Sequence, residues 1–228
     1  LTVFAPFCLS GRITMYLRLL PGESFATGCV QPLSHQGEVA RHLPKFQQLQ
    51  LWCDIDINDQ TIRLFNNHLQ TTEVSRNKRK LEKELRADDT DRAERAALTL
   101  ADGLHENFKK RAAQAEHINQ LISASPYPTL VCGDFNSLPS SYVYQTVKGE
   151  KLNDGFQTCG HGYMYTFRYF KHLLRIDYIL HSSEFQGVDY FSPDLEYSDH
   201  NPVVMRMGYK LTTKNSLMTN LKAIKKQK

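Results

Sequence analysis

The chain has 228 residues, of which 41% are hydrophobic and 23% are charged. This length suits one domain with a substantial core, and the composition argues against a disordered chain. The apolar run at residues 3–9 is far shorter than the roughly 18 residues that a bilayer span needs. The sequence therefore excludes a membrane-spanning helix there and predicts one globular unit.

A formal net charge of +4 suggests at first a protein that binds nucleic acid or another anionic surface. The charge is unevenly distributed, however. Residues 210–228 hold six Lys and no acidic residue, whereas residues 51–209 hold 18 Lys and Arg against 22 Asp and Glu. The positive charge thus belongs to a basic tail, which is most simply a solvated terminus, and the middle of the chain is acidic.

The five cysteines show neither a CxxC pair nor a regular spacing. The sequence therefore indicates neither a zinc knuckle nor a disulfide framework, and we expect a reducing compartment such as the cytoplasm. The first residue is Leu, and no charged segment precedes the apolar run at 3–9, so a secretory signal peptide is not indicated.

Residues 1–50 show little periodicity, and residues 13–20 fit either a strand or a short helix. From residue 51 apolar and polar residues alternate up to 57, and a turn-like segment follows at 58–60. The alternation then resumes up to 68, which predicts a β-hairpin.

Residues 74–123 contain no proline, and their apolar residues recur every three or four positions, which predicts helix with one apolar face. The acidic segment 88–91 favours a break and hence two helices. Buried strands are predicted at 129–132, 175–181 and 203–207. The predicted apolar face of the helical stretch comprises Leu81, Leu85, Ala93, Ala96, Ala97, Leu100, Leu104, Phe108, Ala112, Ala115, Ile118 and Ile122.

Four short segments place Asp, Asn or His in or beside these strands: 66–69, 133–136, 175–178 and 198–202. Taken singly, each is compatible with an ordinary turn or strand end. Strands of one sheet can nevertheless bring distant side chains together, so we consider the four segments as one candidate site.

Asp177 lies within an otherwise apolar strand, where a carboxylate is costly to bury without a partner. His200 would serve, because a bond from Asp177 to one ring nitrogen favours the imidazolium and leaves the other N–H for an anion. Asp134, Asp199 and the amide oxygen of Asn136 are hard ligands suited to Mg²⁺ or Mn²⁺. This chemistry matches phosphate ester hydrolysis.

The motifs NHL (67–69), GDFNS (133–137), RIDYIL (175–180) and SDHNP (198–202) resemble, in this order, those of the endonuclease/exonuclease/phosphatase superfamily. These are metal-dependent phosphodiesterases that include apurinic endonuclease and deoxyribonuclease I, and the stretch 52–207 is similar to a bacterial subgroup. The resemblance implies an α/β sandwich of two mostly antiparallel sheets flanked by helices, incomplete at the N-terminus. We expect an atypical segment at 1–50, the core at 51–209 and the basic tail at 210–228.

The resemblance also implies a role for each matching polar residue. Asp134 would orient or deprotonate the attacking water, Asn136 would hold the phosphate or that water, and Asp199 would ligate the metal. His200, braced by Asp177, would stabilise charge on the phosphoryl oxygens. The catalytic candidates are therefore His68, Asp134, Asn136, Asp177 and His200, and the candidate metal ligands are Asp134, Asn136 and Asp199.

His68 would act on the phosphoryl oxygens from the side opposite His200. Thr166 and Phe167 lie where relatives often place a substrate-facing aromatic residue, although core packing explains Phe167 equally well. We expect a monomer that hydrolyses a phosphodiester, either as a nuclease or on a small molecule or lipid headgroup. A nuclease would need a local basic patch, for example Arg168, Lys171 and Arg175, because the core is acidic overall.

The N-terminal segment departs from the family pattern. Family members open with a strand ending in Asn, followed later by a Gln-Glu pair whose glutamate is the principal metal ligand. Residues 1–50 contain no Asn, and Glu23 and Glu38 each follow Gly. The alternatives are that one of these glutamates replaces the ligand, or that the chain is an inactive or truncated remnant acting as a binding module.

Overall fold

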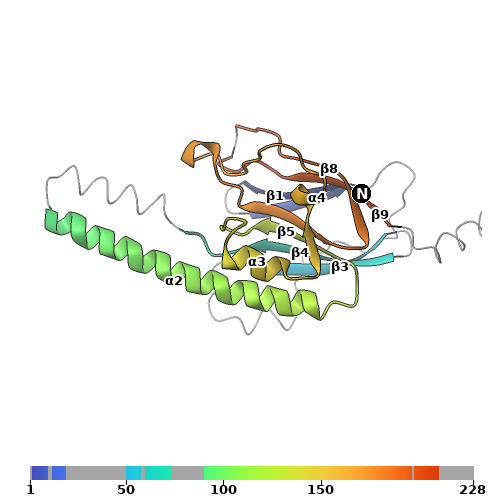
Figure 1. Cartoon of the computed structure of the whole chain (residues 1–228), viewed down its shortest axis with the longest axis horizontal. Helices are drawn as coiled ribbons and strands as arrows, with labels where there is room; N and C mark the ends of the chain where they lie inside the picture. Colours follow the sequence, from blue (N-terminus) through green and yellow to red (C-terminus); the bar gives the residue numbers. More distant parts are fainter. Residues whose placement is uncertain are drawn as a thin grey trace, which may run out of the picture.

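The computed structural model describes residues 2–9, 12–18, 50–57, 60–72, 90–196 and 198–210. Within these residues the chain forms two β-sheets stacked on each other, and the helices at Thr90–Ser123 and Tyr142–Lys148 lie against the outer face of the larger sheet (Figure 1). The predicted α/β sandwich is therefore confirmed. In the described part of the chain, no helix is both long and apolar enough to cross a membrane.

The larger sheet has five strands in the order β3-β4-β5-β7-β6, and the smaller has four in the order β2-β1-β9-β8. Only β4 and β5 run parallel among the described pairs; every other pair is antiparallel. The strands are β1 (Thr2–Leu9), β2 (Arg12–Arg18), β3 (Gln50–Ile57), β4 (Gln60–His68), β5 (Thr129–Asp134), β6 (Leu152–Asp154), β7 (Asp177–Ser182), β8 (Phe185–Phe191) and β9 (Val204–Tyr209). The helices are α2 (Thr90–Ser123), α3 (Tyr142–Lys148) and α4 (Gly155–Cys159), with a short 3₁₀ turn, η2, at Phe170–His172.

The predicted hairpin is the pair β3 and β4, which aligns Ile57 with Gln60 across the turn. At the N-terminus, the structure shows a strand, β2, where the sequence left open a strand or a short helix; residues 19 and 20 of that range lie outside the described residues. Strand β1 pairs with both β2 and β9, so the N-terminal hairpin extends the smaller sheet. The domain division at residue 50 stays a prediction, and the predicted basic tail from residue 211 onward lies outside the described residues.

Two layers of buried side chains follow from the alternation along the strands. Ile62 and Leu64 of β4 belong to the layer between the sheets, whereas Phe65 and Leu69 belong to the layer beneath the helices. Helix α2 completes the second layer with Ala115, Ile118 and Ile122. A fully buried side chain of this size stabilises the fold by about 1.5–3 kcal/mol.

Helix α2 only partly matches its predicted apolar face. Phe108 was expected in the core but is 53% exposed, whereas the polar residues Asn107, Arg111 and Gln114 are buried. The buried face of the helix is therefore displaced from the predicted one, because this part of α2 crosses polar backbone after β4 rather than an apolar sheet surface. The predicted first helix and the break near 88–89 lie outside the described residues.

Gly133 allows β4 and β5 to approach closely at the end of the sheet. Its φ of +148° is unfavourable for other residues, and a Cβ atom there would meet the Asn67 backbone oxygen at 1.9 Å. The glycine of the GDFNS motif therefore fixes the spacing of the two strands immediately before the candidate site.

Candidate active site

Three neighbouring strands place polar side chains in a row at one end of the larger sheet. The parallel register of β4 and β5 pairs His68 with Asp134, and the antiparallel register of β5 and β7 pairs Asp134 with Asp177. Side chains alternate between the faces of a strand, so Asp134 shares its face with Cys132, which packs between the sheets. The row therefore lies on the inner face of the sheet, at the edge of the core.

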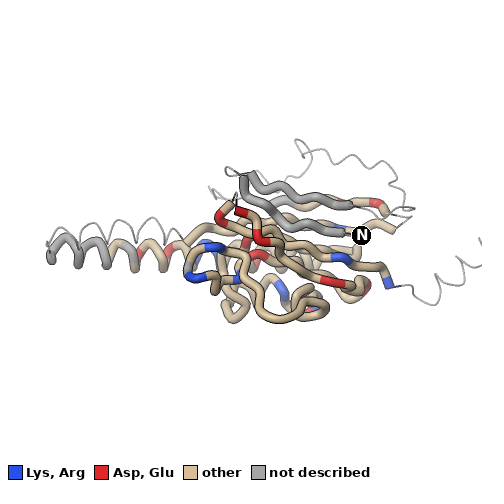
Figure 2. Tube along the Cα trace, turned by 90° about the horizontal axis from the view of Figure 1, so that it is seen from above, with Lys and Arg blue, Asp and Glu red and all other residues tan. Residues whose placement is uncertain are grey.

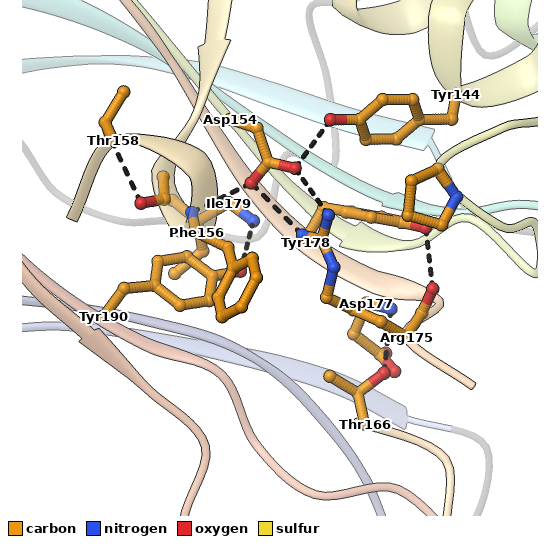
Figure 3. A network of polar contacts seen from close by, with 12 residues as sticks. Tyr144, Asp154, Phe156, Thr158, Thr166, Arg175, Asp177, Tyr178, Ile179 and Tyr190 are labelled. Atoms are coloured by element: carbon orange, nitrogen blue, oxygen red, sulfur yellow. Dashed lines mark hydrogen bonds and ion pairs between the residues drawn. The ribbon is translucent and has the colours of Figure 1, made fainter. Parts of the chain in front are cut away.

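His200 joins this row from the segment between β8 and β9. The N–H of Asn201 donates to the Thr166 carbonyl at 2.7 Å, which holds the segment in place. His200 Nδ1 lies 2.8 Å from Asp177 Oδ2. The backbone N–H of Asp177 in turn donates to the Thr166 hydroxyl at 3.1 Å (Figure 3). Thr166 thus ties the His200 segment to the strand that carries Asp177.

Both imidazole rings face the same oxygen of Asp134. The Nε2 atom of His68 lies 3.6 Å from Asp134 Oδ2, and the Nε2 atom of His200 lies 3.9 Å from it. These distances are longer than hydrogen bonds, so the two rings approach the carboxylate without being locked to it. Two ring nitrogens therefore converge beside one buried carboxylate.

Asn136 closes a tight turn after β5. Its backbone N–H donates to Asp134 Oδ1 at 2.7 Å, and its side-chain Nδ2 donates to Asp134 Oδ2 at 3.1 Å and to the Leu69 carbonyl at 3.2 Å. The φ of Asn136 is +47°, a conformation that Asn tolerates better than most residues. Since Nδ2 is engaged twice, Oδ1 is the amide atom oriented to accept a bond or ligate a cation.

The two histidines differ in charge near neutral pH, because their pKa values are shifted in opposite directions. Burial by itself lowers the pKa of His200, but Asp177 outweighs burial through its charge and hydrogen bond and raises the pKa to about 9. Burial lowers the pKa of His68, and the neighbouring His200 adds to that effect. His200 is therefore a cation and His68 is neutral at pH 7.

Asp134 is a buried carboxylate in an acidic setting. Burial raises its pKa, and the charges of Asp177 and Asp199 raise it further, against the opposing effects of His200 and the Asn136 N–H. Asp199 itself has an exposed side chain and follows Ser198 at the mouth of the site. An additional positive charge beside Asp134 would therefore be strongly favoured.

Asp134 lies in a compact group of possible metal ligands, to which Asp199 does not belong. The described ligand atoms of Asp134, Asp177 and His200 lie within 4.8 Å of one another. His200 is a poor ligand, because its Nδ1 bonds Asp177 and the ring is protonated. The hard oxygens of Asp134, Asp199 and Asn136 remain as the candidates. Glu23 and Glu38, the possible substitutes for the family glutamate, lie outside the described residues.

The predicted basic patch is wrong for Arg168 and Arg175. Arg175 is only 8% exposed and forms an ion pair with Asp154 at 2.8 Å (Figure 3). Arg168 forms an ion pair with Asp194 and also donates to Asn201 Oδ1 at 3.2 Å. Both guanidinium groups hold segments of the fold together, and Lys171 is the exposed member of the set.

Phe167 contacts the candidate site directly. Its ring centroid lies 4.9 Å from that of His200 and 5.4 Å from that of Tyr169, which is 54% exposed. Phe167 therefore packs against His200 and Tyr169, and a substrate-facing role for it stays a prediction.

The sequence prediction did not identify two buried polar residues of α2. The Arg111 side chain donates to the Gln70 carbonyl, and Gln114 accepts from the Gln70 N–H, both at 2.9 Å. The available signal was their spacing, because Arg111 and Gln114 precede Ile118 by seven and four residues and therefore share its buried face.

Comparisons with known proteins agree with this geometry. The sequence model of the endonuclease/exonuclease/phosphatase family matches residues 64–200, a range that contains the first three motifs and the first three residues of the fourth, up to His200. The chain belongs to this family. Family members typically hydrolyse phosphate esters with a divalent metal ion. A comparison with curated proteins found no match.

Several solved structures are similar to this family member over part of their length. A functionally unknown conserved protein from Enterococcus faecalis is 24% identical over 71% of this chain and 56% of that chain, with a TM-score of 0.42. A mannosyl-6-phosphatase from Bacteroides thetaiotaomicron is 17% identical over 71% and 57%, with a TM-score of 0.43. The human Nocturnin catalytic domain is 19% identical over 72% and 54%, with a TM-score of 0.47. The chain thus spans a little over half the length of each of these proteins.

Proposed function

We propose that this protein is a metal-dependent hydrolase of phosphate esters, with a phosphodiester as the best-fitting substrate. The observation that carries the proposal is the strand register that lines up His68, Asp134 and Asp177, completed by His200 on Asp177. A cationic ring and a neutral ring that converge on a buried carboxylate provide both an anion-binding face and a base.

The histidines would bind the phosphoryl group. The His200 cation, held by Asp177, would neutralise charge that develops on a phosphoryl oxygen in the transition state. His68 would donate a hydrogen bond to a second oxygen from the neighbouring strand. Because Asp177 is 1% exposed and its backbone is fixed by Thr166, the position of His200 is set before substrate binds.

Asp134 would act on the attacking water. Its carboxylate lies at the centre of the polar row between His68 and Asp177, where it would take a proton as the oxygen–phosphorus bond forms. The bond to the leaving ester oxygen then breaks, and that oxygen departs as an alcohol after protonation from solvent. Asn136, fixed by Asp134 and Leu69, would orient the attacking water by accepting a hydrogen bond through its amide oxygen.

Asp134, Asp199 and Asn136 would hold the metal, for which Mg²⁺ and Mn²⁺ are the best candidates among hard cations. When bound, such an ion polarises the phosphate and stabilises charge on the leaving oxygen. The convergence of carboxylate charge around Asp134 supports this assignment.

The charge distribution favours a small phosphodiester or a lipid headgroup over a long nucleic acid. Lys and Arg positions are interspersed with Asp and Glu positions over the described residues rather than forming one continuous stripe (Figure 2). A nuclease groove would neutralise successive phosphates with such a stripe. We also expect a monomer, and the cysteine pattern favours a reducing compartment such as the cytoplasm.

An activity screen tests the proposal. Purified protein is assayed with Mg²⁺, Mn²⁺ or EDTA on DNA, RNA, phospholipid and small phosphodiester and monoester substrates. We expect metal-dependent turnover on at least one of them, and a loss of about 10² to 10³-fold in Asp134→Asn and His200→Gln. Unchanged activity in both variants would refute the assigned mechanism.

A binding module is the second candidate, because residues 1–50 lack the Asn and the Gln-Glu pair of the family. Calorimetric titration separates the two. Binding of Mg²⁺ or Mn²⁺ that Asp134→Asn abolishes supports the enzyme, whereas no binding at millimolar metal, together with no turnover, supports the module.

A further inference from the structure

The two residues after His68 are held through all four of their backbone polar groups. The N–H of Leu69 donates to the Asp134 carbonyl at 2.9 Å, and the Leu69 carbonyl accepts from Asn136 Nδ2 at 3.2 Å. The N–H of Gln70 donates to Gln114 Oε1 at 2.9 Å, and the Gln70 carbonyl accepts from Arg111 at 2.9 Å. Two of these bonds come from β5 and the turn after it, and two come from α2.

Arg111 makes one of these bonds with a buried charged group, which carries a large desolvation cost. Its side chain is 0% exposed, and its guanidinium lies 4.6 Å above the ring of the adjacent Phe108. Within the described part of the chain, its Nε and Nη2 atoms have no hydrogen-bond partner. An apolar side chain of similar length would fill this position without burying a charge, so packing alone does not account for an arginine here.

The charge of Arg111 lies close enough to the candidate site to interact with Asp134. Burial lowers the pKa of Arg111 to about 10, so the guanidinium stays charged at neutral pH, and the charge of Asp134 favours that cation. Gln114 is 2% exposed and lies one turn further along the same helix. Gln114 therefore binds the N–H of Gln70 and Arg111 binds its carbonyl, both from the same face of α2.

We propose that Arg111 and Gln114 form a backbone clamp on Gln70 that positions His68 and Asn136 for the reaction. Both are positioning residues that touch neither substrate nor metal. His68 lies two residues before the clamped Gln70, and Asn136 is oriented by the carbonyl of Leu69, between the two. Release of the clamp would let the Leu69 carbonyl move, and both side chains would lose their fixed orientation.

The kinetic effect expected of the clamp rests on the proposed function. The test therefore includes a measurement that does not depend on catalytic activity. Hydrogen exchange of the peptide spanning residues 66–72 is measured by mass spectrometry in the full chain. The variants are Arg111→Met and Gln114→Met, which remove the clamp, and Arg111→Lys and Gln114→Glu, which keep a donor and an acceptor. Lys110→Met is the matched control, because Lys110 is the exposed neighbour of Arg111.

We expect both Met variants to exchange at least about fivefold faster in this peptide, and to lower kcat by about 10 to 100-fold with KM changed less than threefold. The Lys and Glu variants should recover most of both effects, and Lys110→Met should match the wild type. A folded Arg111→Met protein with wild-type exchange would overturn the clamp, as would unchanged kcat in an active enzyme. If the wild type hydrolyses none of the substrates, the proposed function fails, and the exchange data alone decide for or against the clamp.

Discussion

Two buried carboxylates, Asp154 and Asp134, lie on the same sheet and are treated by the fold in opposite ways. Asp154 accepts from Tyr144 at 2.6 Å, from two nitrogens of Arg175 at 2.8 and 3.2 Å, and from the Phe156 N–H at 2.9 Å (Figure 3). Asp134 accepts only from Asn136 among the described donors, and faces two other carboxylates.

The difference separates a structural ion network at Asp154 from the proposed catalytic cluster at Asp134. Around Asp154 every charge is matched, and the Arg175 guanidinium also lies 4.8 Å above the rings of both Phe156 and Tyr178. Around Asp134 negative charge is in excess, because Asp177 and Asp199 add to its own charge, and this excess favours the binding of a cation. The proposed site therefore keeps unfavourable electrostatic interactions, whereas the network around Asp154 pairs its charges.

The largest expected effect comes from breaking the structural network. Asp154→Ala should lower the free energy of unfolding by about 3–5 kcal/mol, because it leaves Arg175 buried and unpaired at 8% exposure. Urea denaturation measures the loss. Hydrolytic activity per folded molecule should change far less than in site variants. A loss below about 1 kcal/mol would show that Arg175 finds another partner.

At the candidate site, removal of the carboxylate charge should raise the free energy of unfolding rather than lower it. Asp134→Asn should raise the free energy of unfolding by about 1–3 kcal/mol at pH 8 in EDTA. The pKa of Asp134 is raised above its unfolded value, so its ionised form is less stable in the folded protein, and stability is lost as pH rises through the folded pKa. The gain should disappear below pH 4, where the carboxyl is protonated in both states. A destabilised variant at pH 8 would contradict this description of the site.

The charge on His200 depends on Asp177. In Asp177→Asn, burial should dominate and lower the pKa of His200 from about 9 to below its ordinary value near 6.5. Nitrogen NMR of the imidazole ring measures this without any substrate. If the enzyme is active, the alkaline limb of kcat/KM should move to lower pH by more than about two units. Asp199→Asn, whose charge acts more weakly on His200, should shift the pKa less.

The smallest effect is expected at an exposed ion pair. Asp189 and Arg206 form such a pair between β8 and β9, where the Arg206 side chain is 56% exposed. Asp189→Ala should cost less than about 1 kcal/mol in urea denaturation, because water already solvates both groups. Together with Asp154→Ala it compares an exposed and a buried Asp–Arg pair in one protein. A loss of stability as large as that of Asp154→Ala would contradict the distinction between the exposed and the buried ion pair.

Much of the fold was predictable because the signals are local. Alternation at 51–57 and 60–68 predicted the hairpin, and the apolar run after Pro128 predicted β5. Helix α3 and strand β6 are seven and three residues long, too short for a periodic pattern to stand out. Strand β8 alternates in burial, but Gly187 and Asp189 interrupt its sequence pattern, and a register shift occurs between these residues.

The sequence by itself identified the residues that we propose to carry the chemistry, because carboxylate, amide and imidazole groups occur in four motifs in the family order. The tertiary structure alone decided how they meet. The alignment of His68, Asp134 and Asp177 depends on strand register, and the burial of Arg111 and Arg175 depends on what the fold packs against them. Periodicity and composition are local properties of the chain, whereas register and charge pairing join residues far apart in sequence and have no local signature.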